Sequence, residues 1–352
     1  MTALPSAFAP RLIAWQRASG RHGLPWQGTR DPYRVWLSEI MLQQTQVSTV
    51  LGYYPRFLER FPDVAALAAA PLDDVMALWS GLGYYSRARH LHRCAQAVVA
   101  QHGGQFPRTA TELQTLPGIG ASTAAAIAAF CFGERVSILD GNVRRVLSRV
   151  LAFEGDVAEA AAQRALWAHA QALLPEAPEG DDMAAYTQGL MDLGATLCTR
   201  SKPACVVCPM VDLCAARMSG DPARFPVKTR KGVRRFERWW LLLAVRADAV
   251  WLQRRPERGI WAGLYAPPVF ASEDALHAAL GDRAARLEPG SPVSHSLTHR
   301  ELELLPQRLP LPADAAPGVP GQWVPWTEAL ALGLPTPVRG LLQVLRDQPL
   351  PQ

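Results

Sequence analysis

The chain lacks the features that mark secreted and membrane proteins. No apolar run approaches the roughly 18–20 residues that a membrane-spanning helix needs. The first fifteen residues, MTALPSAFAPRLIAW, lack a charged segment followed by an apolar one. We therefore expect no signal peptide and no membrane partner.

Charged residues and residues typical of disorder are also few. Charged side chains make up 19% of the 352 residues and hydrophobic ones 49%, so the chain can bury ordinary cores. The 26 glycines and 30 prolines stay below the proportion that indicates a disordered chain. The length favours two domains. The net charge of +5 suits a polyanionic partner such as DNA but does not require one.

Cysteine is scarce, yet four of the six cysteines fall in one segment, CTRSKPACVVCPMVDLC. Four thiolates this close can hold zinc or an iron–sulfur cluster. Only the middle pair has the CxxC form typical of zinc sites, so the asymmetric spacing favours one 4Fe-4S cluster. Free thiols that hold a metal fit the reducing cytoplasm better than a disulfide framework does. The expected ligands are Cys198, Cys205, Cys208 and Cys214.

Residues 1–214 have the pattern of an all-α domain. Asp31 followed by proline is a typical helix start, and apolar spacing continues the helix through PYRVWLSEIMLQQ. Thr45 is the expected cap of the next helix. Runs that resemble strands are scarce, and further helices are expected in the alanine-rich stretches at 64–70, 94–100, 121–129 and 158–173.

The character of the sequence changes after residue 214. Residues 215–235 are basic and interrupted by proline and glycine, which predicts an extended linker. Residues 236–348 read as an α+β domain. It opens with a hairpin, WWLLLAV and AVWLQRR around a short turn. Further strands are expected at 263–268, 293–305 and 321–326, and helices at 273–281 and 337–347.

A glycine-rich turn, LPGIG, leads into the helical stretch ASTAAAIAAF. Such a turn exposes the free N–H groups of a helix N-terminus, which can hold a phosphate without a basic side chain. With the preceding TELQTLPG it resembles a helix-hairpin-helix DNA-binding motif over about 108–130. The expected phosphate-binding residues are Leu116, Gly118 and Gly120.

The order of three motifs is informative. The hairpin is followed about twenty residues later by Asp140, in LDGNVRRVLSR, and then by the cysteine segment. This order resembles the endonuclease III superfamily of DNA glycosylases over most of residues 10–214. The resemblance implies a helical glycosylase fold with an iron–sulfur loop at 198–214. It also implies that Asp140 is the carboxylate near C1′ of the extruded nucleotide.

Two positions indicate which glycosylase this is. Bifunctional members carry a nucleophilic lysine where this chain has Ser122, and serine cannot form a Schiff base. We therefore expect a monofunctional enzyme that uses water. Glu39 lies in SEIMLQQTQ, which with LPW at 24–26 and WSGLGYYSRAR at 79–89 closely resembles the adenine DNA glycosylase (MutY) family.

The pairing of Glu39 with Asp140 makes chemical sense. Adenine leaves deoxyribose poorly unless a ring nitrogen is protonated, and a carboxylic acid kept neutral among apolar residues can donate that proton. An ionised carboxylate can then stabilise the oxocarbenium ion or trap it transiently. We expect Glu39 to be the acid and Asp140 the second carboxylate.

The resemblance implies further contacts with the lesion. Gln44 and Tyr84 match residues that insert into the DNA, with Leu82 beside them. Gln188, in YTQGLMDLGA, matches a residue that reads the edge of the flipped adenine. Ser122 is expected in the same adenine pocket.

The C-terminal domain resembles the Nudix-like domain of the same family, through WLQRRPERGIWAGLYAPP. No metal-binding REXXEE run follows, so we expect recognition of DNA and not hydrolysis of nucleoside diphosphates. The family's Phe-Ser-His loop probes 8-oxoguanine. Here Leu297, Thr298 and His299 take those places. The hydroxyl and an apolar side chain are kept, but two residues differ.

The sequence thus predicts a monomeric, cytoplasmic adenine DNA glycosylase. Its expected partner is double-stranded DNA with adenine mispaired with 8-oxoguanine or guanine. A bifunctional glycosylase/lyase of the endonuclease III type is one alternative, and a non-enzymatic zinc DNA-binding protein is another.

Overall fold

The computed structural model describes residues 3–229 and 234–347. Their contacts form two compact units. Among the described residues, the first joins 3–68 with 93–229, and the second joins 69–92 with 234–347. These units are defined by contacts, so the domain boundaries expected from the sequence stay a prediction.

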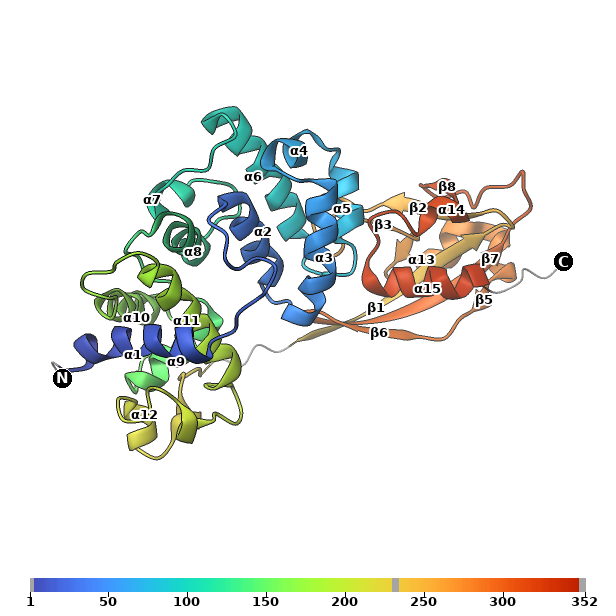
Figure 1. The fold of residues 1–352 in the computed structure, drawn as a ribbon. Coiled ribbons are helices and arrows are strands. Elements are labelled where there is room, and N and C mark those ends of the chain that lie inside the picture. Colours follow the sequence, from blue (N-terminus) through green and yellow to red (C-terminus); the bar gives the residue numbers. More distant parts are fainter. Residues whose placement is uncertain (1–2, 230–233, 348–352) are drawn as a thin grey trace. The chain divides into compact units, whose positions relative to one another are not determined.

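The first unit is helical, as Figure 1 shows. Helices α4 (Val64–Ala69) and α6 (Ser86–His102) lead into and out of the segment 69–92, which holds α5 (Leu72–Trp79). The other helices are α1 (Ala3–Ser19), α2 (Pro32–Leu42), α3 (Val47–Arg60), α7 (Ala110–Leu113), α8 (Ala121–Phe132), α9 (Gly141–Val150), α10 (Ala160–Ala172), α11 (Asp182–Thr196) and α12 (Ala215–Met218), with short 3-10 turns η1 (Cys205–Val207) and η2 (Pro222–Arg224).

Local signals set several helix starts. The Asp31 side chain accepts a hydrogen bond from the Tyr33 N–H, which caps α2 as expected. The expected cap at Thr45 is wrong: Gln46 is the N-cap of α3, and the Thr45 hydroxyl donates to the Gln43 carbonyl instead. A hydroxyl bonded back to the preceding turn is a common competitor of capping.

The helices of the first unit bury one large core. Helices α1, α8, α9 and α11 supply most of it, and residues 123–129 of the expected alanine-rich stretch are buried. Small side chains let neighbouring helices approach α8 closely, and this carries the residues at its N-terminus toward α9. Core side chains include Phe8, Leu12, Ile138, Val143, Leu147, Leu166, Tyr186 and Leu190.

The second unit contains a mixed sheet. Its order is β3-β2-β1-β7-β5, while β4 pairs with β1, β6 with β7 and β8 with β2. Strands β1 and β7 run parallel along their whole length, and the other pairs are antiparallel. The strands are β1 (Arg235–Val245), β2 (Ala249–Arg254), β3 (Tyr265–Ala266), β4 (Val269–Phe270), β5 (Glu288–Pro289), β6 (Val293–Ser296), β7 (Arg300–Pro310) and β8 (Gln322–Pro325).

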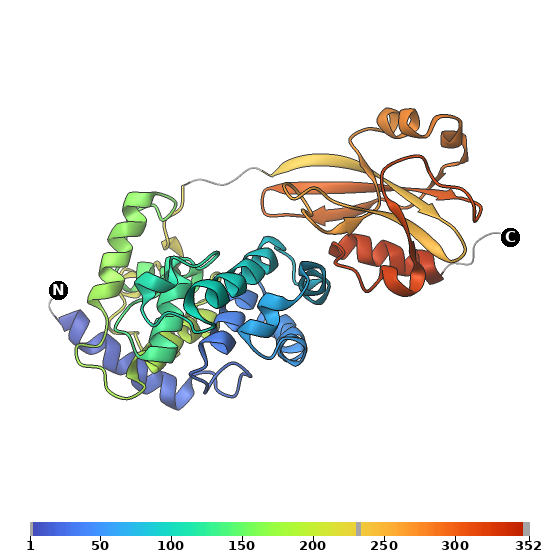
Figure 2. The same ribbon diagram turned by 90° about the horizontal axis from the view of Figure 1, so that it is seen from above.

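Helices cover both faces of this sheet. Figure 2 shows α13 (Glu273–Leu280) on one side and α15 (Thr336–Asp347) on the other, with the turn η3 (Gly281–Arg286) after α13 and the short α14 (Trp326–Ala329) after β8. Alternate residues of β1 serve the two faces: Leu242 and Ala244 pack with Leu276 of α13. The expected hairpin is confirmed. The single strand expected over 293–305 is wrong, because a turn at 297–299 separates β6 from β7.

The segment 69–92 is bonded to the sheet and helices of the second unit. The Ser80 hydroxyl donates to the Leu334 carbonyl (2.8 Å), and the Tyr85 hydroxyl donates to the same oxygen (3.0 Å). The Arg89 guanidinium donates to the Ala262 carbonyl at 2.6 Å. These bonds explain why contacts group 69–92 with residues from 232 onward.

The basic segment is not extended where the structure describes it. Residues 215–229 form α12 and η2, and Phe225 is buried. The Val157 N–H donates to the Val227 carbonyl, so the chain packs back on the first unit. The expectation of an extended conformation is corrected for 215–229, while most of 230–235 lies outside the described residues.

None of the described helices is both long and apolar enough to cross a membrane.

Candidate active site

A cavity of the first unit has a volume of about 670 Å³. Its walls come from the end of α1, the loop over residues 20–30, α2, α8 and α11. Two residues singled out from the sequence, Glu39 and Gln188, line it together. Residues more than 140 positions apart therefore meet at one concave site, which is the usual form of a small-molecule or base pocket.

Glu39 belongs to α2, between apolar neighbours that include Val35 and Leu42 at the cavity wall. Burial raises the pKa of its carboxyl to about 8, and the charge of Asp140 contributes in the same direction. A group with this pKa is mostly protonated at pH 7. Glu39 can therefore donate a proton to a bound molecule.

Asp140 is the N-cap of α9, and its side chain accepts a hydrogen bond from the Val143 N–H at 2.7 Å. Burial raises its pKa, while the N–H groups of Val143 and Asn142 and the nearby Arg145 oppose that rise. The two carboxyls are thus treated differently. Helix N–H groups and a cation support an ionised Asp140, but only desolvation and a like charge act on Glu39.

Ser122 lies in the first turn of α8, and its hydroxyl accepts a hydrogen bond from the Leu139 N–H at 3.1 Å. Leu139 directly precedes Asp140, so this bond ties the start of α8 to the start of α9. The structure thus places Ser122 against the backbone of the residue that precedes Asp140. It offers a hydroxyl there and no amine.

The glycine-rich turn connects α7 to α8 as a helical hairpin. Gly118 has a φ of +79°, which favours glycine, and Gly120 is the N-cap of α8. Both glycines are exposed, whereas the Leu116 side chain is buried and its carbonyl accepts the Ile119 N–H. Leu116 therefore shapes the turn, and the exposed N–H groups lie at the glycines.

Gln44 and Tyr84 share an unusual backbone. Their φ angles are +55° and +48°, a region that side chains other than glycine seldom occupy. Gln44 is exposed, and Tyr84 is 44% exposed with the Arg87 guanidinium over its ring. Strain of this kind often occurs at functional sites. Leu82 differs, because its side chain is only 5% exposed.

The expected recognition residues form the turn between β6 and β7. The Leu297 N–H donates to the Arg300 carbonyl at 2.8 Å, which closes the turn, and Thr298 and His299 are exposed. The Thr298 hydroxyl donates to the Tyr84 hydroxyl at 3.3 Å. Both residues belong to the second unit, so this unit presents two of the predicted lesion contacts side by side.

The four clustered cysteines line one small cavity below α9 and α11. All six cysteines of the chain are free thiols. Within 3–229 and 234–347 no group of three or more potential ligands is close enough to hold a metal ion. The arrangement of ligands around a cluster therefore stays a prediction.

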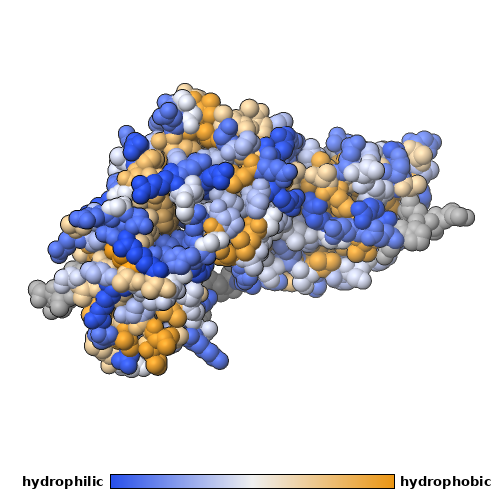
Figure 3. Space-filling view, in the orientation of Figure 1, coloured by the Kyte–Doolittle hydropathy of each residue, from blue (hydrophilic) through white to orange (hydrophobic). Residues whose placement is uncertain are grey.

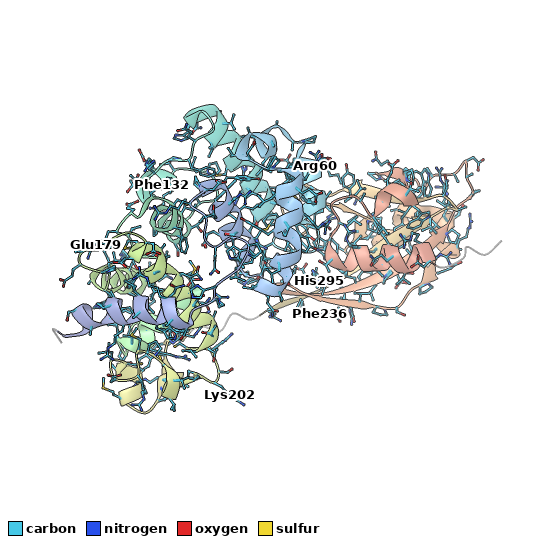
Figure 4. All side chains as sticks on the ribbon, in the orientation of Figure 1. Arg60, Phe132, Glu179, Lys202, Phe236 and His295 are labelled. Atoms are coloured by element: carbon cyan, nitrogen blue, oxygen red, sulfur yellow. The ribbon has the colours of Figure 1, made fainter. Side chains whose placement is uncertain are left out.

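A residue that the sequence analysis missed holds the cysteine loop. Arg149 is almost fully buried, and its guanidinium donates to the Cys198 sulfur at 3.3 Å and to the carbonyls of Thr199, Arg200 and Phe225. A cation beside this sulfur suits a thiolate. The loop also carries Lys202, whose exposed side chain points away from the unit in Figure 4.

The cysteine loop and the neighbouring α12 expose three large apolar side chains. Val206 is 88% exposed, Val207 66% and Met218, on α12, 63%. The space-filling view in Figure 3 shows orange surface over this part of the first unit.

The comparisons with known proteins assign the helical hairpin and the cavity to a base excision DNA repair enzyme. Residues 37–171 match the model of the HhH-GPD superfamily base excision DNA repair proteins, and residues 239–344 match the NUDIX domain model. The fold of the first unit resembles a thermostable thymine-DNA glycosylase, with a TM-score of 0.55 and 27% identity over 62% of this chain and 98% of that one.

Full-length relatives identify the family. The adenine DNA glycosylase of Buchnera aphidicola from Schizaphis graminum is 30% identical over 96% of this chain and 99% of its own length. The mouse adenine DNA glycosylase is 35% identical over 97% of this chain and 78% of its own length. The human one is 45% identical over 60% of this chain and 40% of its own. This chain belongs to the adenine DNA glycosylase family, whose members are base excision repair hydrolases.

Proposed function

We propose that this enzyme hydrolyses the N-glycosidic bond of adenine mispaired with 8-oxoguanine or guanine in double-stranded DNA, leaving an abasic site. The observation that carries the proposal is Glu39, whose pKa is raised to about 8 at a cavity shared with Gln188. Membership of the family points to adenine as the base that is released. The carboxyl of Glu39 is the acid that release of adenine needs.

In the proposed reaction, adenine leaves the duplex and enters the cavity. Extrusion costs a few kcal/mol, less at a mispair. Gln188 reads the edge of the base, and Glu39 gives its proton to a ring nitrogen. As the C1′–N9 bond breaks, positive charge develops on the sugar, and Asp140 stabilises that cation or traps it transiently. Water completes the hydrolysis, because Ser122 offers no amine for a Schiff base.

The contacts outside the cavity serve to hold the duplex. Gln44 and Tyr84 insert at the lesion, which their exposure and strained backbones support. The turn at Gly118 and Gly120 holds a phosphate at the N-terminus of α8. Leu297, Thr298 and His299 probe the opposing 8-oxoguanine. We leave Leu82 out of the insertion, since its buried side chain would first have to move.

We also propose that Cys198, Cys205, Cys208 and Cys214 hold one 4Fe-4S cluster that shapes the loop. The proposal is supported by the four cysteines that line one small cavity, where the Arg149 guanidinium donates to the Cys198 sulfur. Reduced cysteines are consistent with a cytoplasmic location. Metal analysis of the pure protein tests the cluster: iron with visible absorption supports it, and zinc in colourless protein excludes it.

One duplex series tests the activity. Adenine is placed opposite 8-oxoguanine, guanine, cytosine or thymine, and strand scission is compared with and without alkali. We expect release opposite the two guanine bases and scission only after alkali. Scission without alkali would indicate the bifunctional alternative, and no release from any duplex would exclude the proposal.

The Glu39→Gln variant tests the acid. It should bind the same duplexes and release adenine at least 100-fold more slowly, on the order of the lower range for general acid catalysis. The control is Glu154→Gln, which removes an exposed carboxylate paired with Arg224 and should not alter the rate. Near-normal release by Glu39→Gln would remove this residue from the mechanism.

A further inference from the structure

A buried acid lies behind the residue expected to read the base. Gln188 and Asp192 are one turn apart on α11, and the Gln188 Nε2 donates to Asp192 Oδ1 at 2.8 Å. The Arg21 side chain donates to the same oxygen at 2.7 Å, and the Arg21 backbone N–H donates to Oδ2 at 2.9 Å. The Asp192 side chain is fully buried.

This arrangement fixes the direction of the Gln188 amide. An amide side chain is a donor at one end and an acceptor at the other, and the two ends have nearly the same shape. In the structure the amide nitrogen faces Asp192, because it donates to the oxygen that also accepts from the Arg21 side chain. The Gln188 oxygen is therefore turned away from Asp192, at a residue that lines the cavity.

We propose that Asp192 is a positioning residue for base selection. It orients the Gln188 oxygen so that this oxygen accepts a hydrogen bond from an exocyclic amine, as in adenine. The same oxygen repels an exocyclic carbonyl, as in hypoxanthine. This inference rests on the proposed function, because it assumes that Gln188 meets the flipped base. It adds a reason why one purine is favoured over another of almost equal size.

A purely structural role for Asp192 is the competing explanation. The same carboxylate ties the loop that starts at Arg21 to α11, and loss of that tie would slow every substrate alike. The variant Asp192→Asn separates the two roles. With its nitrogen in the place of Oδ1, the asparagine keeps the bond from the Arg21 backbone N–H, loses the bond from the Arg21 side chain, and can donate to the Gln188 oxygen and so reverse the amide.

The experiment measures single-turnover release of adenine and of hypoxanthine, each placed opposite 8-oxoguanine. We expect Asp192→Asn to lower the ratio of the adenine rate to the hypoxanthine rate roughly tenfold, since one hydrogen-bonding group is inverted. The exposed control Glu154→Gln should keep the ratio of the unsubstituted enzyme. An unchanged ratio in Asp192→Asn, or equal loss of both rates, overturns the inference.

A second variant covers the case in which Asp192→Asn does not fold. Gln188→Met removes the amide at similar size and should lower the ratio to a comparable degree. Combining it with Asp192→Asn, where both are stable, should lower the ratio no further. Full selectivity in Gln188→Met overturns the inference. If the unsubstituted enzyme releases no adenine at all, the proposed function fails and this inference fails with it. If the unsubstituted enzyme prefers adenine and both variants keep the same ratio of rates, only this inference is contradicted.

Discussion

At the scale of single residues, the two carboxyls show how placement divides one chemical group into two roles. Glu39 lies in the middle of α2 against the cavity, without a helix end to support its charge. Asp140 begins α9 and receives a backbone N–H. Desolvation acts on both, but only Asp140 has N–H groups and nearby arginines that oppose it.

This difference predicts how stability and activity depend on pH. The Glu39 pKa is raised from 4.5 to about 8 on folding, so between these values the folded chain binds more protons than the unfolded chain. Stability should therefore fall as pH rises through this window. The unsubstituted enzyme should lose roughly 2–4 kcal/mol of its free energy of unfolding in this window. The Glu39→Gln variant should not show this loss.

Urea unfolding at pH 5 and pH 8 measures the difference, with Glu154→Gln as the control. The rate of adenine release should also decline above an apparent pKa near 8, which belongs to the coupled pair. If stability depends on pH in the same way in Glu39→Gln and in the unsubstituted enzyme, the raised pKa of Glu39 is not the cause.

At the scale of elements, the ends of helices carry most of the proposed site. Asp140 caps α9, Gly120 caps α8, and Gln44 follows the C-terminus of α2. Helix ends expose unpaired N–H groups and allow unusual backbone angles. A helical scaffold can thus place the second carboxylate, the proposed phosphate-binding turn and the proposed inserting side chain at the ends of helices, while Glu39 lies within α2.

The backbone of Gln44 offers a test at this scale. Gln44→Gly removes a side chain from a φ of +55°, so the free energy of unfolding should stay unchanged or rise by up to about 1 kcal/mol. Adenine release should slow at least tenfold, because the inserting side chain is lost.

Gln46→Gly is the matched control. Gln46 is exposed with a φ of −72°, and its loss should give no gain in stability and no loss of rate. Urea unfolding and single-turnover release give both readings. A large loss of stability in Gln44→Gly would show that the side chain holds α2 and α3 together. Its role would then be structural, and not insertion into DNA.

At the scale of the whole molecule, the segment 69–92 belongs with residues far along the chain. It supplies Tyr84, and its neighbour Tyr85 is an anchor that donates to the Leu334 carbonyl and accepts from the Gly81 N–H. The exposed ring and the anchored ring are adjacent in sequence. Tyr85 thereby fixes the place from which Tyr84 extends.

Tyr85→Phe should lower the stability of the second unit by about 1–2 kcal/mol, because the Leu334 carbonyl loses a partner. Since the chain has two units, protease resistance of the sheet is a better measure than a single unfolding midpoint. Tyr84→Phe is the control, and its exposed hydroxyl should matter little for stability. Equal resistance of both variants would contradict the anchoring role.

The features that could be predicted from the sequence depend on residues close together in the chain, or on motifs shared with a known family. The helices, the cap at Asp31 and the hairpin of β1 and β2 follow from residue order, and the family from long matches around Glu39. The sequence missed Asp192 and Arg149, because their partners are set by helix packing: Arg21 is 171 positions from Asp192, and Cys198 is 49 from Arg149. It also missed that Leu82 is buried, since burial depends on neighbours that the pattern does not name.

The hydrogen bond from Ser80 to Leu334 also bears on the order in which parts of the chain can fold during synthesis. These residues are 254 positions apart. At a synthesis rate of 5–20 residues per second, Ser80 emerges roughly 10–50 seconds before its partner exists. During that interval the neighbouring helices are already available, while 69–92 lacks the surface that it finally packs against. In a newly made chain the segment 69–92 therefore completes its packing only after Leu334 has been made.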